Sequence, residues 1–271
     1  MHKTPNRPRA EAPEAITNPD WSGIMDAALT LEGSTGDTYR RLYNYSMGNI
    51  AFLMYQGVLP QPVATYDRWK SVGRHVKRGA SAAYILRPIT VNLKDELDDD
   101  GQPKTVQRFK PVKSVFPISM TEGEPLPELE HPAWDKARAL GELAITQVPY
   151  QSYDGNAQGY SFEHSFAVNP VAMYPDKTMM HELSHIVAGH TEQATAEEPV
   201  AHRGLVEFEA EGSAHLVMNE LDLLTPDMAT VSRGYIQGWL KGERPSDRSI
   251  RKTFTTADRI IRAGEAQGGE E

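Results

Sequence analysis

Residues 181–185 read His-Glu-Leu-Ser-His, inside a segment whose apolar residues recur at helical spacing. Histidines four residues apart lie one above the other on one helix face, so both imidazoles can bind one ion. Glu182 points in another direction and can reach a water on Zn²⁺, whose pKa the metal lowers towards about 7. The stretch therefore predicts one zinc ion per chain, with His181 and His185 as ligands and Glu182 as general base. The alternative is a surface helix with two incidental histidines.

A catalytic zinc needs a third protein ligand and an open position for water. The candidate segment is residues 207–211, which read Glu-Phe-Glu-Ala-Glu. Glu207 and Glu211 share a helix face, so one can bind the metal while the other supports a ligand histidine. We expect Glu207 to be the ligand and Glu211 to be the support. The reverse assignment and a solvated acidic face are the alternatives. Glu209 lies about 200° around the helix from Glu207 and is expected to face elsewhere.

The other histidines carry weaker signals. His190 follows Gly189 at the end of the predicted helix, where it could line a cleft, although capping of backbone carbonyls is favoured. His164 could lie beside a substrate on an edge strand, but an ordinary core or surface histidine is the preferred interpretation. His202 and His215 indicate no function.

Upstream of the metal motif, the sequence predicts an α+β fold in which N-terminal helices and a β-hairpin come first. Residues 82–93 and 105–118 are strand-like and are separated by the acidic run 95–101, which indicates a hairpin with a long tip. Pro88 favours an edge strand or a bulge. Further strands are expected at 147–153 and 159–168, with a turn at 154–156, and helices at 21–31, 37–55, 66–71, 133–146, 203–222, 227–241 and 247–265. The metal-motif helix is expected to begin at an Asp176 cap and to end at Gly189.

Composition sets the class of protein. The chain has 271 residues and no cysteine, so disulfides are excluded and His, Asp or Glu must hold any metal. This composition fits a reducing cytoplasm. No apolar run is long enough for a membrane span, and residues 1–17 are expected to be a disordered tail without a secretory signal. The Pro- and Glu-rich segment 122–132 reads as a linker, which divides the chain into domains at 18–125 and 126–271.

The two halves differ in charge. Residues 1–120 carry a net charge of +4, whereas residues 121–271 carry −13. Cations that follow a phosphate backbone and rings that stack on bases are typical of single-strand DNA binding. A solvated charged face with core aromatics is the equal alternative. The candidate DNA-binding residues are Arg68, Trp69, Lys70, Arg74, Lys77, Arg78 and Arg87, with Lys104, Arg108, Lys110 and Lys113 on the facing strand.

Between residues 38 and 265 the chain resembles the ArdC-type antirestriction proteins. The similarity lies in Tyr45-Ser46-x-x-Asn49, Gln56, Pro60, Trp69-x-x-x-Gly73-Arg74-x-Val76-Lys77-Arg78-Gly79, Val115-Phe116, Thr121-Glu122-Gly123-x-Pro125-Leu126-Pro127, residues 181–190, residues 207–211 and Tyr235-Ile236-x-x-Trp239-Leu240. Residues 207–211 also resemble the third-ligand helix of HtpX-like and ImmA/IrrE-like peptidases, where the first glutamate is the ligand. The chain departs from the pattern at Pro117–Met120, which weakens a DNA-contact role for this stretch.

The resemblance implies an N-terminal single-stranded-DNA-binding domain followed by a zincin-like metallopeptidase domain. Two functions follow as expectations. The first is a DNA-binding zinc peptidase that hydrolyses an unidentified protein substrate. The alternative is a non-proteolytic antirestriction factor that shields incoming plasmid or phage DNA, with a structural or vestigial metal site. The acidic second half suggests that DNA is confined to the first half, and no membrane partner is expected.

Overall fold

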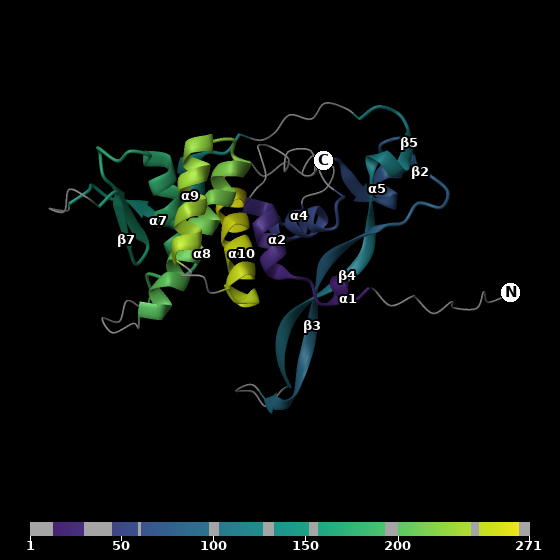
Figure 1. Cartoon of the computed structure of the whole chain (residues 1–271), viewed down its shortest axis with the longest axis horizontal. Coiled ribbons are helices and arrows are strands. Elements are labelled where there is room, and N and C mark those ends of the chain that lie inside the picture. The colour runs from purple at the N-terminus through teal and green to yellow at the C-terminus, as the bar shows by residue number, and fades with distance from the viewer. Residues whose placement is uncertain are drawn as a thin grey trace.

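The computed structural model describes residues 13–29, 45–58, 61–97, 103–126, 133–151, 157–192, 200–239 and 244–265. Helices and small antiparallel or mixed sheets alternate along the chain, so the predicted α+β class is confirmed (Figure 1). Among these residues, no helix has the length and apolar character that crossing a membrane requires.

The N-terminal helices are present where the structure describes them, with one difference at the start of the second predicted helix. After the single turn α1 (Glu14–Thr17), α2 spans Trp21–Leu29 and α4 spans Met47–Tyr55. The expected helix over 37–55 is wrong at its start within the described residues, because Ser46 has extended backbone and its side chain caps the helix by accepting the Asn49 N–H. Residues 30–44 lie outside the described residues.

The predicted hairpin is confirmed and is longer than expected. β3 (Ala83–Leu97) pairs antiparallel with β4 (Pro103–Pro117), and β1 (Val63–Thr65) adds to the other side of β4. The sheet order β1-β4-β3 makes β3 an edge strand, which accommodates Pro88. The hairpin extends away from the helical body as a two-stranded arm (Figure 1).

A small unit packs at the base of the hairpin. Helix α5 (Tyr66–Ser71) is present with the predicted bounds. It contacts a two-stranded sheet formed by β2 (Arg74–Val76) and β5 (Thr121–Gly123). The short helix η1 (Ile118–Met120) directly precedes β5. Trp69 is the centre of a small second core in this unit.

The sheet beside the metal motif differs from the expectation. Residues 159–168 form two strands, β7 (Gly159–Phe162) and β8 (Ser165–Val168), because Glu163 adopts a left-handed conformation and turns the chain. The strand expected over 147–153 is reduced to β6 (Thr146–Gln147), which pairs parallel with β8. The preceding helix α6 is also shorter, at Lys136–Glu142, because Asp135 caps its first turn.

Four helices complete the fold. They are α7 (Pro175–Val187), α8 (Val200–Glu220), α9 (Pro226–Trp239) and α10 (Asp247–Gly264). The expected Asp176 cap is wrong, because Tyr174 occupies the cap position and Asp176 lies in the first turn. Gly189 follows the end of α7 with a positive φ of 76°, as expected for a helix terminator.

One hydrophobic core runs through both halves of the sequence. Ile24 and Phe52 of the N-terminal helices belong to the same buried cluster as Met180, Phe208 and Phe254 of the C-terminal helices. Figure 1 shows α2 and α4 lying between the helical body and the hairpin. The division near residue 125 is therefore not a break in the core.

Candidate metal centre

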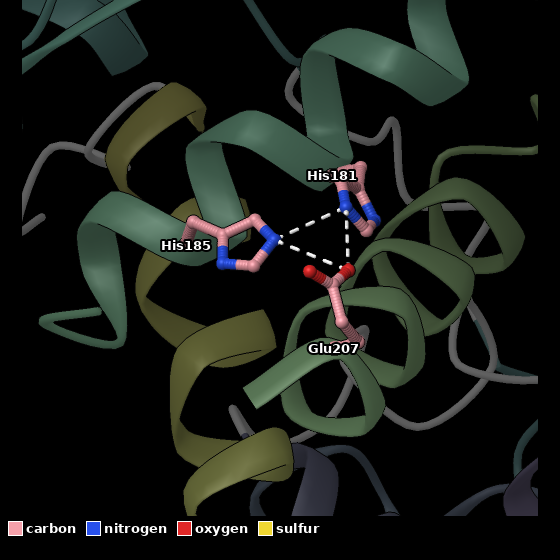
Figure 2. A group of neighbouring side chains, drawn as sticks. All are labelled: His181, His185 and Glu207. Atoms are coloured by element: carbon pink, nitrogen blue, oxygen red, sulfur yellow. Dashed lines mark hydrogen bonds and ion pairs between the residues drawn. The ribbon is translucent and has the colours of Figure 1, made fainter. Parts of the chain in front are cut away.

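Helix α7 presents the two histidines of the motif on one face. His181 and His185 are one helical turn apart, and their Nε2 atoms lie 3.1 Å from each other. The opposite face of α7 is apolar, and Met180 and Leu183 are completely buried there. Burial of that face fixes the rotation of the helix, so both imidazoles point towards α8 (Figure 2).

Glu207 on α8 completes a triangle of donor atoms. Its Oε2 lies 3.4 Å from His181 Nε2 and 3.6 Å from His185 Nε2. Donors about 2.0–2.1 Å from a tetrahedral zinc are separated by about 3.3–3.4 Å. These two separations, together with that of 3.1 Å between the histidines, match one face of such a tetrahedron. The donor set therefore fits a single zinc ion with one open position.

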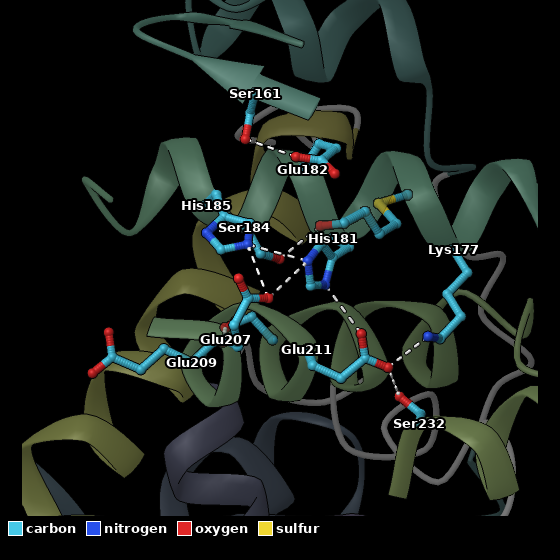
Figure 3. A network of polar contacts seen from close by, with 12 residues as sticks. Ser161, Lys177, His181, Glu182, Ser184, His185, Glu207, Glu209, Glu211 and Ser232 are labelled. Atoms are coloured by element: carbon cyan, nitrogen blue, oxygen red, sulfur yellow. Dashed lines mark hydrogen bonds and ion pairs between the residues drawn. The ribbon is translucent and has the colours of Figure 1, made fainter. Parts of the chain in front are cut away.

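Glu182 lies on a different side of α7 and is 8% exposed. Its Oε2 accepts a hydrogen bond of 2.7 Å from the Ser161 hydroxyl on β7 (Figure 3). Gly159 lets this strand approach, because a Cβ at that position would lie 2.9 Å from the Ala167 carbonyl and 3.2 Å from Glu182 Oε1. The carboxylate is held beside the histidines without occupying a place among the three donors.

Glu211 contacts the outer nitrogen of the first histidine. Its Oε2 lies 3.0 Å from His181 Nδ1, and its Oε1 contacts Lys177 and Ser232. A carboxylate at Nδ1 favours a proton on that nitrogen and leaves the Nε2 lone pair for a metal. Although burial raises the pKa of Glu211, the contacts with His181 and Lys177 outweigh it and hold that pKa at about 2.

As Glu211 supports His181, a hydrogen-bonded pair of residues, His190 and Glu209, supports His185. The sequence did not reveal this second relay. His190 Nδ1 lies 3.1 Å from His185 Nδ1, and His190 Nε2 lies 2.9 Å from Glu209 Oε2. Because burial lowers the pKa of His190, the neutral ring donates from Nε2 to Glu209 and accepts at Nδ1 from His185. Glu209 is anchored in turn by Lys252 and Ser249 of α10. The capping role favoured for His190 is therefore wrong, whereas Glu209 does face away from the donor triangle.

The three donors hold a proton among them. Burial lowers the pKa of His181, but hydrogen bonds to Glu207 and Glu211 outweigh it and raise that pKa to about 9. Burial raises the pKa of Glu207, but its hydrogen bonds with His181 and His185 leave it below the ordinary range. A metal that enters this cluster must displace that proton.

An open cleft of about 470 Å³ lies next to these groups. Its walls come from α7, α8, α9 and the start of β7, and Glu182 is among the lining residues. β7 is an edge strand of the described three-stranded sheet, whose order is β6-β8-β7. The cleft is lined by Gln158, Gly159, Met173, Tyr174, Lys177, Thr178, His181, Glu182, Glu207, Glu211 and Val231.

The candidate DNA-binding residues differ in their exposure. Trp69 is fully buried, and its indole N–H donates to the Phe116 carbonyl, so the prediction that it stacks on bases is wrong. Arg74 is engaged with the Thr121 hydroxyl and the carbonyls of Gly123 and Glu124. The remaining candidates, Arg68, Lys70, Lys77, Arg78 and Arg87, are exposed on α5, after β2 and on β3.

The exposed cations of the hairpin include an unfavourable pair. Arg87 lies directly opposite Lys110 in the register of β3 and β4. Like charges in directly opposed positions destabilise a sheet. Arg108 and Lys113 are also exposed on β4, and the side chain of Lys104 lies outside the described residues.

Comparison with known proteins identifies the fold. No protein-family model matches the chain, and no curated protein matches it. A crystal structure of the antirestriction protein ArdC from plasmid R388, in its metal-free form, matches with a TM-score of 0.51 and 16% identity, covering 90% of this chain and 96% of that one. The Mn(II)-bound structure of the same protein matches with a TM-score of 0.48 and 14% identity, covering 92% and 99%. The chain thus has an α+β fold of the antirestriction-protein type, with a potential metal-binding triad. The particular fold is that of ArdC, and the resemblance seen in the sequence is confirmed at this level.

Proposed function

We propose that this protein is a zincin-like metallopeptidase of the antirestriction type that also binds single-stranded DNA. The observation that carries the peptidase assignment is the donor triangle of His181, His185 and Glu207 with Glu182 beside it in an open cleft. A structural zinc normally has four protein ligands and needs no adjacent carboxylate. Three donors, an open position and a held carboxylate instead favour hydrolysis.

The residues divide the chemistry among them. His181, His185 and Glu207 would hold one Zn²⁺, which lowers the pKa of a bound water and polarises a substrate carbonyl. Glu182 accepts the proton of the attacking water and delivers it to the amide nitrogen as the peptide bond breaks. The Ser161 hydrogen bond occupies Glu182 Oε2, so Oε1 is the oxygen available for this transfer.

The edge strand β7 supports a peptide as the substrate class. An extended segment can add to an exposed sheet edge through backbone hydrogen bonds. β7 begins at the cleft, since Gly159 lines it, and pairs only with β8 among the described residues. The substrate is thus proposed to be an extended segment of a protein, with side chains meeting the apolar rim at Met173 and Val231.

A Glu182→Gln variant tests the peptidase assignment. It should bind one zinc per chain as the wild type does, because no ligand is changed, yet lose hydrolysis of an unstructured protein by about 10²–10⁴-fold. His181→Ala should lose both metal and hydrolysis. Metal content is measured by elemental analysis, and zinc and manganese are supplied separately because imidazole and carboxylate ligands suit both. Full hydrolysis by Glu182→Gln would overturn the assignment.

The alternative function is DNA shielding without proteolysis. The directly opposed Arg87 and Lys110 favour a DNA-binding role, because a phosphate that lies across them would offset their repulsion. An antirestriction assay on wild type and Glu182→Gln separates the two functions. Equal protection by both proteins would favour shielding, and loss of protection by Glu182→Gln would favour proteolysis.

A further inference from the structure

Helix α10 is basic although it lies in the acidic half of the sequence. Residues 247–264 contain five Lys or Arg and two Asp, whereas residues 121–271 carry a net charge of −13. Four of the cations, Arg248, Arg251, Arg259 and Arg262, are exposed along the helix. The solvent-exposed face of α10 is therefore basic, although the second half of the sequence is acidic overall.

Three of these arginines line a cavity of about 330 Å³. Arg251, Arg259 and Arg262 form one wall of it. The other walls come from Trp21 of α2, the first turn of α4, and the hairpin residues Leu86 and Phe109. The cavity thus lies where α10 meets the N-terminal helices α2 and α4. Its volume is at the lower end for ligand pockets, which suits a single small unit of a ligand.

The guanidinium groups of this wall have few competing anions. Arg251 Nε donates to the Asp247 carbonyl, and its guanidinium lies 5.5 Å from the centre of the Trp21 ring. Arg259 Nη1 donates to the Val187 carbonyl at 2.8 Å. Within the described part of the chain, no ion pair joins Arg251, Arg259 or Arg262 to a carboxylate.

One carboxylate, that of Asp258, also lines the cavity. Its Oδ1 accepts the Met47 N–H at 2.8 Å and so caps the first turn of α4. The wall therefore holds three guanidinium groups against one carboxylate that is bonded to backbone. A phosphate is the anion that arginine binds best, through paired N–H donors.

An exposed aromatic ring lies at the rim of the same cavity. Phe109 is 51% exposed although it is paired with Pro88 in the middle of the hairpin register. An exposed ring beside a cavity can contact a bound ligand through its face. A ring next to cations provides the two contacts that a nucleotide offers, which are base stacking and phosphate pairing.

We propose that this cavity binds one nucleotide of a single-stranded nucleic acid. Its phosphate pairs with Arg259 and Arg262, and its base stacks on Phe109. This inference rests on the proposed DNA-binding function and extends it, since it places part of the strand on α10 of the C-terminal half. A strand that follows the exposed cations of β3 and β4 would reach α10 across the base of the hairpin.

The test uses the full-length protein and a fluorescein-labelled dT12 oligonucleotide, followed by anisotropy at several salt concentrations. Arg262→Ala should weaken binding and reduce the slope of log affinity against log salt by about 0.7, because one phosphate contact is lost. Phe109→Ala should weaken binding by about 5- to 150-fold with the slope unchanged, because stacking is not ionic. On an oligonucleotide with abasic sites, Phe109→Ala should bind as the wild type does.

Matched controls come from the same chain. Arg248→Ala removes an exposed arginine of α10 that does not line the cavity, and Phe162→Ala removes a comparably exposed ring on β7. Neither should change dT12 binding. If the wild type binds dT12 and Arg262→Ala and Phe109→Ala bind equally well, the cavity assignment is wrong while DNA binding stands. If the wild type does not bind dT12 at low salt, both fail. Displacement of dT12 by micromolar dTMP would show that the ligand of the cavity is a free nucleotide and not a nucleotide of a strand.

Discussion

His185 Nδ1 lies 3.1 Å from His190 Nδ1, so the second histidine of the motif is held by a third histidine just beyond the end of α7. Through His190 the contact continues to Glu209, and through Glu209 to α10. His181 has a shorter relay, directly to Glu211. With a metal bound, both histidines would therefore carry their proton on Nδ1 and direct the lone pair of Nε2 to the same point.

Removal of the His190 ring should weaken metal binding without removing a ligand. We expect His190→Ala to lower zinc affinity by about 10- to 100-fold, because the orientation and tautomer of His185 are no longer fixed. Competition with a chromophoric chelator measures this. His164→Ala, which changes an exposed histidine in the turn between β7 and β8, is the control and should bind zinc as the wild type does. Equal affinities for His190→Ala and wild type would show that the relay is not needed.

Neutralising one member of the opposed pair on the hairpin should stabilise the protein. Arg87→Gln removes the repulsion with Lys110, so the free energy of unfolding should rise by about 0.2–1 kcal/mol at low salt. The gain should shrink as salt screens the charges. The same variant should bind dT12 less tightly. Urea denaturation at two salt concentrations measures the first effect, with Arg87→Lys as the control that keeps the charge. A loss of stability would contradict the argument.

Trp69 should matter for stability and not for stacking. Its ring is fully buried and its N–H is bonded to the Phe116 carbonyl, so Trp69→Ala should lower the free energy of unfolding by about 3–5 kcal/mol. Tyr66→Ala on the same helix removes a ring that is 55% exposed and should change stability by less than about 0.5 kcal/mol. Denaturant titration compares the two. A stable Trp69→Ala protein would place the ring outside the core.

Local signals in the sequence predicted much of the fold. The hairpin, α5 and the C-terminal helices follow from period and capping residues, and these act over a few residues. The hairpin at 159–168 was missed because its turn uses Glu163 at positive φ, without a Gly, Asn or Asp to indicate it. The prediction of one helix from residue 37 to residue 55 did not take into account that Ser46, in the middle of the segment, is a strong capping residue.

The donor residues of the site could also be named from spacing, since i and i+4 positions share a helix face. The relay to His185 could not, because it needs His190 to fold back after Gly189 and Glu209 to reach from another helix. Likewise, nothing local marks Trp69 as buried rather than exposed. Contacts between distant segments decide both cases, and no single-segment pattern contains them.

His215 should make stability depend on pH. Burial lowers its pKa to about 4, and the charge on Arg233 adds to this effect, while its Nε2 donates to the Leu29 carbonyl. Above pH 6.5 the ring is neutral in both folded and unfolded chains. As pH falls from 6.5 towards 4, only the unfolded chain takes up the proton, so this residue should remove about 3 kcal/mol of stability.

A His215→Gln variant, which cannot titrate, isolates that contribution. The difference in unfolding free energy between wild type and variant should change with pH between 6.5 and 4, and should be constant above 6.5. Denaturant titrations at pH 4.5, 5.5, 6.5 and 7.5 measure it. A difference that does not vary with pH would mean that His215 takes up its proton equally in both states.

The shared core has a consequence for any attempt to dissect the molecule. Ile24 and Phe52 from before residue 125 are covered by the same interior as Phe208 and Phe254 from after it. A truncation near residue 125 would remove part of this core from each fragment and expose apolar side chains to water. The fragments would then aggregate or unfold. A loss of DNA binding or of peptide hydrolysis in a fragment would therefore not test the intact chain. Separation of the metal centre from the basic surfaces therefore calls for point substitutions, because residues from both sides of that position share one buried cluster.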